Sequence, residues 1–180
     1  MGKTIEGLFR GIRRCRKCER CRTRQLAVPG EGSARRKIVL LGEAPGKTED
    51  LIGRPFVGRT GRYLDKVFEE HGVNRDDFFI TSILKCYHPE SPQAHQIEAC
   101  RPWTIQQIAE LRPKAILVMG LTAAQGLLGI SELANEPVVW EGITCVMTVH
   151  PTAAMRFPKR NPRFRHDLEQ VLTVAAGSVG

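Results

Sequence analysis

Four short apolar runs, separated by segments with helical periodicity, are the feature that most constrains the fold of this chain. The strand-like runs are Lys37–Leu41, Phe78–Leu84, Ala115–Met119 and Thr144–Val149. The helical patterns cover about Gly61–Glu70, Ala94–Leu111, Thr122–Leu128 and Arg163–Ala175. Strands that alternate with helices predict parallel strands joined by right-handed crossovers, with helices on both faces of the sheet. We therefore expect an α/β fold of three layers, α/β/α, with a central four-stranded parallel sheet.

Length and composition suit a single domain with its own hydrophobic core. The chain has 180 residues, of which 42% are hydrophobic and 26% charged. We expect one domain over residues 1–180, with a cysteine-rich segment at its N-terminus. No apolar run approaches the length of a membrane helix, and the basic N-terminus lacks the apolar core and cleavage site of a secretory signal. These observations predict a cytoplasmic protein that does not contact membranes.

The excess of basic residues favours a polyanionic partner, with nucleic acid as the first candidate. The net charge is +8, although a protein that is merely basic would show the same composition. The charges gather at the two ends of the chain. The first group comprises Arg10, Arg13, Arg14, Arg16, Lys17, Arg20, Arg22 and Arg24, and the second comprises Arg156, Lys159, Arg160, Arg163 and Arg165.

A loop dense in glycine and proline follows the first strand. It reads Gly42-Glu43-Ala44-Pro45-Gly46-Lys47-Thr48-Glu49-Asp50 and continues as Gly53-Arg54-Pro55-Phe56-Val57-Gly58. In open α/β sheets, ligands bind at the carboxyl ends of the strands, where this loop lies. Parallel strands would bring four side chains of different chemistry to that edge: Glu43, Phe56, Ser82 and His150. A carboxylate, an aromatic ring, a hydroxyl and an imidazole in one cleft are the components of an active site.

Structural roles are the alternatives for the same residues. Glu43 could cap the turn that follows it, Phe56 could belong to the core, and His150 could simply end a strand. The simplest interpretation of Glu49 and Asp50 is a pair of solvated loop charges, with Asp50 kept as a secondary candidate for the site.

The six cysteines suggest a metal site. Cys15-x-x-Cys18-x-x-Cys21 has the spacing found in zinc and iron–sulfur sites, and a reducing compartment argues against disulfides. Four ligands are usually needed, so Cys86 and Cys100 are candidates to complete the site. The spacing leaves open which metal is bound and which of the first three cysteines are ligands, and scattered free thiols remain the structural alternative. Cys145 lies inside an apolar strand and is expected to be a core thiol.

Taken together, these motifs resemble the family-four uracil-DNA glycosylases, the iron–sulfur branch of the uracil-DNA glycosylase superfamily. The similarity covers nearly the whole chain and comprises Cys15-x-x-Cys18, Arg24, Val28–Gly32, Gly42–Gly61, Lys85-Cys86, Cys100 and His150-Pro151. The resemblance implies the superfamily fold and an enzyme that hydrolyses the N-glycosidic bond of uracil in DNA to leave an abasic site. The implied partner is uracil-containing DNA, single- or double-stranded, and the enzyme is expected to be a monomer.

The resemblance also implies a role for individual residues. A 4Fe–4S cluster would be held by Cys15, Cys18, Cys86 and Cys100, with Cys21 as an extra thiol. Gly42, Ala44, Pro45 and Gly46 would line the base pocket, with Asp50 at a recurrent position beside them. Phe56 would stack on the flipped base, and His150 would stabilise the departing uracil anion. Met155 and Arg156 would enter the duplex. From the chemistry of its side chain, Glu43 is a candidate to orient water and stabilise positive charge on the sugar.

One departure from the family pattern concerns base recognition. The family has an Asn after the Thr of the second strand, whereas this chain reads Thr81-Ser82. A carboxamide can donate to and accept from the uracil edge at once, but a hydroxyl is a single short group. Two further hypotheses therefore stay open: the same fold acting on another deaminated base, and a nucleic-acid-binding iron–sulfur protein without turnover.

Overall fold

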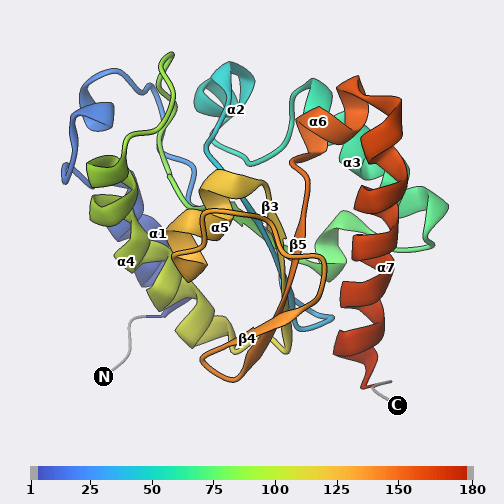
Figure 1. Cartoon of the computed structure of the whole chain (residues 1–180). Coiled ribbons are helices and arrows are strands. Elements are labelled where there is room, and N and C mark those ends of the chain that lie inside the picture. The colour runs from blue at the N-terminus through green and yellow to red at the C-terminus, as the bar shows by residue number, and fades with distance from the viewer. Residues whose placement is uncertain (1–3, 178–180) are drawn as a thin grey trace.

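The computed structural model of the chain describes residues 4–177, which build a sheet with helices on both sides (Figure 1). The strands have the spatial order β2-β1-β3-β5-β4. Their bounds are β1 Ile38–Gly42, β2 Phe79–Ser82, β3 Ala115–Met119, β4 Val138–Trp140 and β5 Ile143–Thr148. The pairs β1·β2, β1·β3 and β3·β5 are parallel, so the carboxyl ends of four strands meet at one edge, as expected.

The sheet has five strands, where the sequence predicted four. The additional strand β4 lies at the edge and pairs antiparallel with β5. Glu141 and Gly142 join the two strands with φ angles of 48° and 77°. Two successive residues with positive φ form the tight hairpin turn that suits the twist of antiparallel strands. A strand of three residues is too short to show a clear period, which explains why the prediction missed it. The second strand also ends at Ser82, two residues earlier than expected.

The helices form the two outer layers of the predicted α/β/α arrangement. One face of the sheet is covered by α1 (Ile5–Arg13), α4 (Ala94–Leu111) and α5 (Leu121–Leu128), and the other by α3 (Arg59–Glu70), α6 (Pro151–Arg156) and α7 (Asn161–Ala176). The short helix α2 (Lys47–Ile52) extends from the carboxyl end of β1, within the segment expected to be a loop. Short 3₁₀ turns complete the elements: η1 (Glu19–Arg22), η2 (Arg75–Asp77) and η3 (Pro158–Arg160). Within residues 4–177, no helix is long and apolar enough to cross a membrane.

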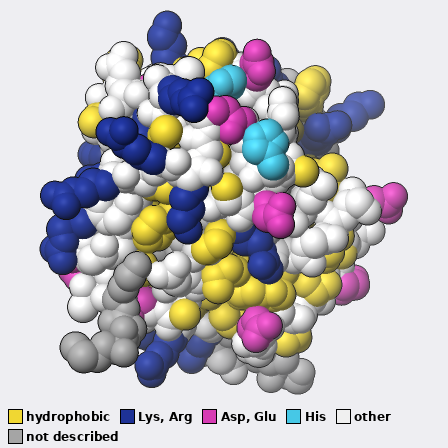
Figure 2. All heavy atoms as spheres, turned by 90° about the vertical axis from the view of Figure 1, so that its left-hand side faces the viewer, with side chains coloured by type: hydrophobic (Ala, Val, Ile, Leu, Met, Phe, Trp, Pro, Cys, Tyr) yellow, Lys and Arg dark blue, Asp and Glu magenta, His cyan; other side chains and the backbone are white. Residues whose placement is uncertain are grey.

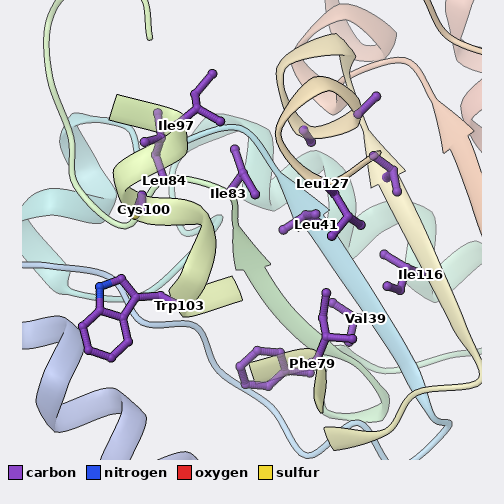
Figure 3. Close-up of a cluster of buried hydrophobic side chains, with 14 of the residues drawn as sticks. Val39, Leu41, Phe79, Ile83, Leu84, Ile97, Cys100, Trp103, Ile116 and Leu127 are labelled. Carbon is purple, nitrogen blue, oxygen red and sulfur yellow. The ribbon is translucent and has the colours of Figure 1, made fainter. Parts of the chain in front are cut away.

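Alternation along the buried strands supplies a hydrophobic core to each face. In β1, Val39 and Leu41 pack on the α4 side, whereas Ile38 and Leu40 pack on the α7 side. Figure 3 shows the first of these cores, with Cys100 and Trp103 projecting from α4. All four β1 side chains are fully buried, so the strand that leads into the glycine-rich loop is held from both faces.

The opening basic segment contains an amphipathic helix that the sequence analysis did not assign. Thr4 caps α1 by accepting a hydrogen bond from the Gly7 amide at 3.2 Å. Leu8 and Ile12 are buried one turn apart, and the helix packs against α4. This contact brings the N-terminal cysteines, which follow α1, close to α4.

Candidate active site

A pocket of about 200 Å³ lies at the carboxyl edge of the sheet. It is lined by Ala44, Pro45, Gly46, Lys47, Thr48, Glu49, Pro55, Phe56, Gly58, Arg59, Thr60, Ser82, His150 and Thr152. Segments that are far apart in the sequence therefore meet at one cavity. Its volume is smaller than that of a typical drug-sized site and suits a single small ring.

Phe56 forms one wall of the pocket, and two glycines allow it to do so. The ring lies so close to Gly42 that a Cβ atom there would stand 2.6 Å from Cζ. Gly61 makes a similarly close approach to the Phe56 carbonyl, which leaves no room for a side chain. Phe56 itself has a φ angle of 48°, a left-handed conformation that costs a non-glycine residue about 1–3 kcal/mol. The ring is 7% exposed, so it is both a core side chain and a pocket wall.

His150 stands opposite Phe56, with 6.2 Å between the ring centroids. Its Nδ1 accepts a hydrogen bond from the Thr152 amide at 3.2 Å, at the N-terminus of α6. An acceptor at Nδ1 leaves the proton of a neutral imidazole on Nε2. Burial lowers the pKa of His150, an effect partly offset by the negative charge of Glu43. His150 therefore provides a neutral N–H donor at the pocket.

Glu43 is half-buried and is not among the pocket-lining residues. Its Oε2 accepts a hydrogen bond from Thr122 Oγ1 at 2.6 Å, in the first turn of α5. The Glu43 carbonyl accepts from the Leu84 amide at 3.0 Å, which ties the loop to the segment after β2. The carboxylate is thus held in one orientation, close enough to influence His150 electrostatically.

Glu49 and Asp50 are buried, which corrects their interpretation as solvated loop charges. Glu49 lines the pocket, and its Oε1 accepts from the amides of Val57 and Gly58 at 2.9 and 2.8 Å. Asp50 is 4% exposed and does not line the pocket. Its carboxylate accepts from the Gln25 and Leu26 amides at 3.0 to 3.3 Å. These contacts give Asp50 a part in anchoring the loop and leave its substrate role without support.

Several pocket residues carried no signal in the sequence. Thr60 and Thr152 join across the cavity through a hydrogen bond of 3.0 Å between their hydroxyl groups. Lys47 and Arg59 are exposed cations at its rim. Their spacing in the chain is irregular, and only the folded loop brings them together. The dense Gly-Pro segment was the one available indication that its neighbours line a site.

The candidate DNA-contacting residues lie next to the pocket. Met155 and Arg156 occupy the last turn of α6, the helix that His150 begins, and Figure 1 shows α2 and α6 at the same end of the molecule. Met155 is half-buried and Arg156 is exposed. Phe157, which follows them, is 53% exposed and is a second apolar side chain available to nucleic acid.

The basic side chains do not form a single uniform group. Figure 2 shows the face that carries α1 and α4, where Lys and Arg side chains gather mainly along one side. Arg20 is an exception because it is 1% exposed and points inward. Arg163 and Arg165 form ion pairs with Asp167 and Glu70. The predicted basic clusters therefore divide into exposed cations and structural ones.

Five of the six cysteines line one small hollow between the N-terminal segment, the end of β2 and α4. They are Cys15, Cys18, Cys21, Cys86 and Cys100, with Arg24, Lys85 and Trp103 beside them. Cys145 is fully buried in β5, as predicted for a core thiol. Within residues 4–177, no three potential ligands stand close enough together for one metal ion.

The donors around this hollow suit sulfur atoms that carry negative charge. Arg24 Nη1 lies 2.8 Å from Cys86 Sγ, and Trp103 Nε1 lies 3.3 Å from Cys15 Sγ. Both groups can only donate, so the sulfurs must accept. Thiolates accept such bonds far better than thiols do. Burial raises the pKa of Cys18, Cys86 and Cys100, so these groups would become thiolates on binding a metal rather than as free side chains.

Two buried cations beside the hollow point to the same charge. Arg20 and Lys85 are each 1% exposed, and neither belongs to an ion pair with a carboxylate in residues 4–177. Burial lowers the pKa of Lys85 to about 7, because burial disfavours its charged form. Both cations are hydrogen-bonded to uncharged oxygens, and negative charge nearby would favour their charged forms further. The residues present therefore fit an anionic group bound by several thiolates.

The architecture and the site together define an α/β protein with a small pocket at the carboxyl ends of its parallel strands. The sequence profile of the Uracil DNA glycosylase superfamily matches residues 29–173. The chain belongs to this superfamily.

Individual relatives indicate the branch. A type-4 uracil-DNA glycosylase of Pyrobaculum aerophilum is 36% identical over 178 residues, covering 91% of each chain. The type-4 enzyme of Saccharolobus solfataricus is 35% identical and covers 88% of this chain and 79% of its own length. A type-5 uracil-DNA glycosylase of Pyrobaculum aerophilum is 28% identical and covers 69% of this chain and 65% of its own. The type-4 relatives are thus similar over more of the chain than this type-5 relative.

Proposed function

We propose that this protein is a uracil-DNA glycosylase of the type-4 branch, which hydrolyses the N-glycosidic bond of uracil in DNA and acts as a monomer. The observation that carries the proposal is the pocket in which Phe56, Ser82 and His150 face a single small cavity. The names of the type-4 relatives support the same activity.

The pocket implies that the base leaves the duplex before reaction. Flipping a nucleotide costs a few kcal/mol, about 2–4. Stacking of the base on an aromatic ring returns about 1–3 kcal/mol. Phe56 is fixed in place by its contacts with Gly42 and Gly61, so little side-chain entropy is lost when a base stacks on it. The flipped state is therefore stabilised without movement of the wall.

His150 serves the bond-breaking step. Cleavage between C1′ and the base nitrogen leaves the electron pair on the base, which becomes an anion. A fixed N–H donor at a pyrimidine carbonyl stabilises that charge, as an oxyanion hole does. The Nδ1 contact with Thr152 keeps the His150 proton on Nε2, the atom from which it can be donated. The imidazole remains neutral and need not be reprotonated between turnovers.

We assign Glu43 to the sugar side of the reaction, because its charge reaches His150 although its side chain does not line the cavity. Loss of the base leaves positive charge at C1′, which a nearby carboxylate stabilises. Water then adds its hydroxyl to C1′, and its proton goes to the protein or to the departing base. Thr122 holds the carboxylate through Oε2, which orients the group before substrate arrives.

The cysteine hollow is the proposed site of a 4Fe–4S cluster held by Cys15, Cys18, Cys86 and Cys100. When bound, the cluster would be structural and would fasten the N-terminal segment to β2 and α4. The donors on Cys15 and Cys86 and the buried Arg20 and Lys85 support an anionic occupant. Cys21 lines the same hollow, so the choice of four ligands rests on the spacing of the family motif.

The direct test is release of free base by the purified protein. Matched duplexes and single strands would carry uracil, hypoxanthine or xanthine at one position, and abasic-site formation would be measured by alkaline cleavage. The proposal predicts cleavage at uracil on at least one of these substrates. DNA binding without release of any base would instead support a protein without turnover.

Ser82 provides the observation behind a second candidate, activity on another deaminated base. It lines the pocket beside Gly42, with its hydroxyl 3.5 Å from the position that a Cβ at Gly42 would take. This position supports a role for Ser82 in recognising the edge of a stacked base. A single hydroxyl leaves part of the uracil edge unpaired, which lowers the penalty for other bases.

Replacing Ser82 by Asn is expected to raise uracil release and sharpen the preference for uracil over hypoxanthine. The carboxamide adds a second hydrogen bond at the base edge, worth about tenfold in discrimination. The measurement is kcat/KM for each base in the same duplex. Ser91→Asn, at an exposed position, is the matched control. An unchanged rate and base ranking would show that residue 82 does not face the base.

Replacing Arg156 by Ala is expected to weaken DNA binding several-fold for every sequence. The slope of log affinity against log salt concentration should fall by about one, which corresponds to the loss of one phosphate contact. Arg112→Ala is the control because Arg112 is exposed just before β3, at the opposite edge of the sheet. Affinity would be measured by fluorescence anisotropy across a salt series. Equal effects of the two variants would contradict a specific role for α6.

Met155 offers a more specific test of the duplex contact. An apolar wedge is needed only where a flipped base leaves a gap in a stack. Met155→Ala should therefore lower uracil release from duplex DNA by several-fold and leave release from single strands nearly unchanged, as measured by single-turnover cleavage. A parallel loss on both substrates would argue against a wedge.

A further inference from the structure

We propose that Lys85 is a positioning residue that couples the base pocket to the cysteine hollow. The inference rests on the proposed function for the meaning of the pocket. It concerns a buried side chain that no step of the proposed reaction uses, at the point where the two sites come closest along the chain.

The Lys85 ammonium is fully hydrogen-bonded in the interior. Its Nζ lies 2.7 Å from Thr81 Oγ1, 2.6 Å from the Ser82 carbonyl and 2.8 Å from Gln107 Oε1. Thr81 and Gln107 each donate to the Pro29 carbonyl, at 2.9 and 2.8 Å. Their oxygens are therefore oriented as acceptors toward Lys85. Three acceptors match the three N–H groups of a charged lysine.

One of these acceptors belongs to the wall of the pocket. The Ser82 carbonyl receives Lys85, and the Ser82 side chain lines the pocket. The residues that follow bind the glycine-rich loop: the Ile83 amide donates to Gly42 and the Leu84 amide to Glu43, at 2.9 and 3.0 Å. The backbone that Lys85 holds is thus the same backbone that carries the base-facing hydroxyl and supports Glu43.

Lys85 also belongs to the lining of the cysteine hollow. Lys85 lines the hollow together with its neighbour Cys86 and with Cys100 from α4. No carboxylate forms an ion pair with it within residues 4–177. The segment that carries Lys85 thus runs directly from the pocket wall at Ser82 to the cysteine-lined hollow at Cys86. Lys85 holds the pocket end of this short segment through the Ser82 carbonyl.

The test compares Lys85→Met with Lys66→Met, which makes the same substitution at an exposed position of α3. Activity is expressed per iron-loaded molecule, so that loss of protein or cluster is counted separately. Lys85→Met should lower kcat/KM for uracil about tenfold and alter the ranking of uracil against hypoxanthine. Lys66→Met should leave both unchanged. Unchanged values for loaded Lys85→Met would overturn the proposal.

Hydrogen exchange gives a readout that does not depend on activity. Lys85→Met should increase exchange at the Ile83 and Leu84 amides, which donate to the glycine-rich loop, while amides in α7 stay protected. Unchanged protection at these two amides would also overturn the proposal. If the wild-type protein released no base, the proposed function would fail, and this measurement would still decide the role of Lys85.

Milder variants guard against a Lys85 substitution that does not fold. Thr81→Val and Gln107→Leu each remove one acceptor and leave the ammonium in place. Each should shift base ranking and amide exchange in the same direction as Lys85→Met, by a smaller amount. A purely structural role would instead lower the melting temperature and leave the activity per loaded molecule and the local exchange unchanged, which would overturn the proposal.

Discussion

Replacing His150 by alanine is expected to slow uracil release by about 10²–10³-fold while DNA affinity stays nearly the same. The donor at Nε2 acts on charge that develops only as the bond to the base breaks, so its loss affects kcat far more than binding. Single-turnover cleavage and anisotropy would measure the two quantities. Since burial lowers the pKa of His150 from its ordinary value, the imidazole is already neutral at pH 7, and the wild-type rate should not require a protonated His150 there.

Two controls separate this role from a structural one. His150 also caps α6 through its contact with Thr152, so His150→Asn, which retains a capping side chain, reports the capping contribution. His166→Ala removes an exposed imidazole from α7 and should leave the rate unchanged. A loss of DNA affinity as large as the loss of rate in His150→Ala would contradict a role in the transition state.

Replacing Cys18 by serine is expected to remove the cluster altogether. Anaerobically prepared wild-type protein should be brown and contain about four irons per chain, whereas Cys18→Ser should be colourless and nearly free of iron. The melting temperature should fall as well, because the buried Arg20 and Lys85 would lose the negative charge that compensates them. Iron analysis, visible absorption and calorimetry would measure these effects.

Cys21→Ser is the matched control because Cys21 lines the same hollow and differs from Cys18 only in the family spacing. It should retain colour and iron. Full iron in Cys18→Ser together with loss of iron in Cys21→Ser would show that Cys21, and not Cys18, is the cluster ligand. Stoichiometric zinc without iron in anaerobic wild-type protein would exclude the iron–sulfur assignment.

Patterns that depend on near neighbours were predictable from the sequence. The bounds of α4 agree with the expected helix over Ala94–Leu111. The strands β1 and β3 were also located, since buried parallel strands are continuous apolar runs. The hairpin between β4 and β5 was not, because its Glu-Gly pair is not among the usual Asn-Gly and Asp-Gly turn signals.

Charged residues were the least predictable part of the site. Arg20 was counted in the N-terminal basic cluster expected to meet a polyanion, and Glu49 and Asp50 were interpreted as solvated, yet all three are buried. Their burial depends on partners that sequence spacing does not reveal. Arg20 Nε, for example, donates to Gln96 Oε1 at 2.6 Å across 76 positions of the chain.

By itself, the sequence determined the class of the fold, the loop that would line a pocket and the cysteines that would share a site. These follow from local periodicity, from the backbone demands of glycine and proline, and from motif spacing. Only the tertiary structure decided that, of the four side chains expected at this edge, Glu43 does not line the cavity. It also decided that His150 presents Nε2–H, and that Lys85 is hydrogen-bonded to the pocket wall and lines the cysteine hollow. The physical reason is that hydrogen bonds and burial join residues through space, whereas a sequence pattern records only neighbours along the chain.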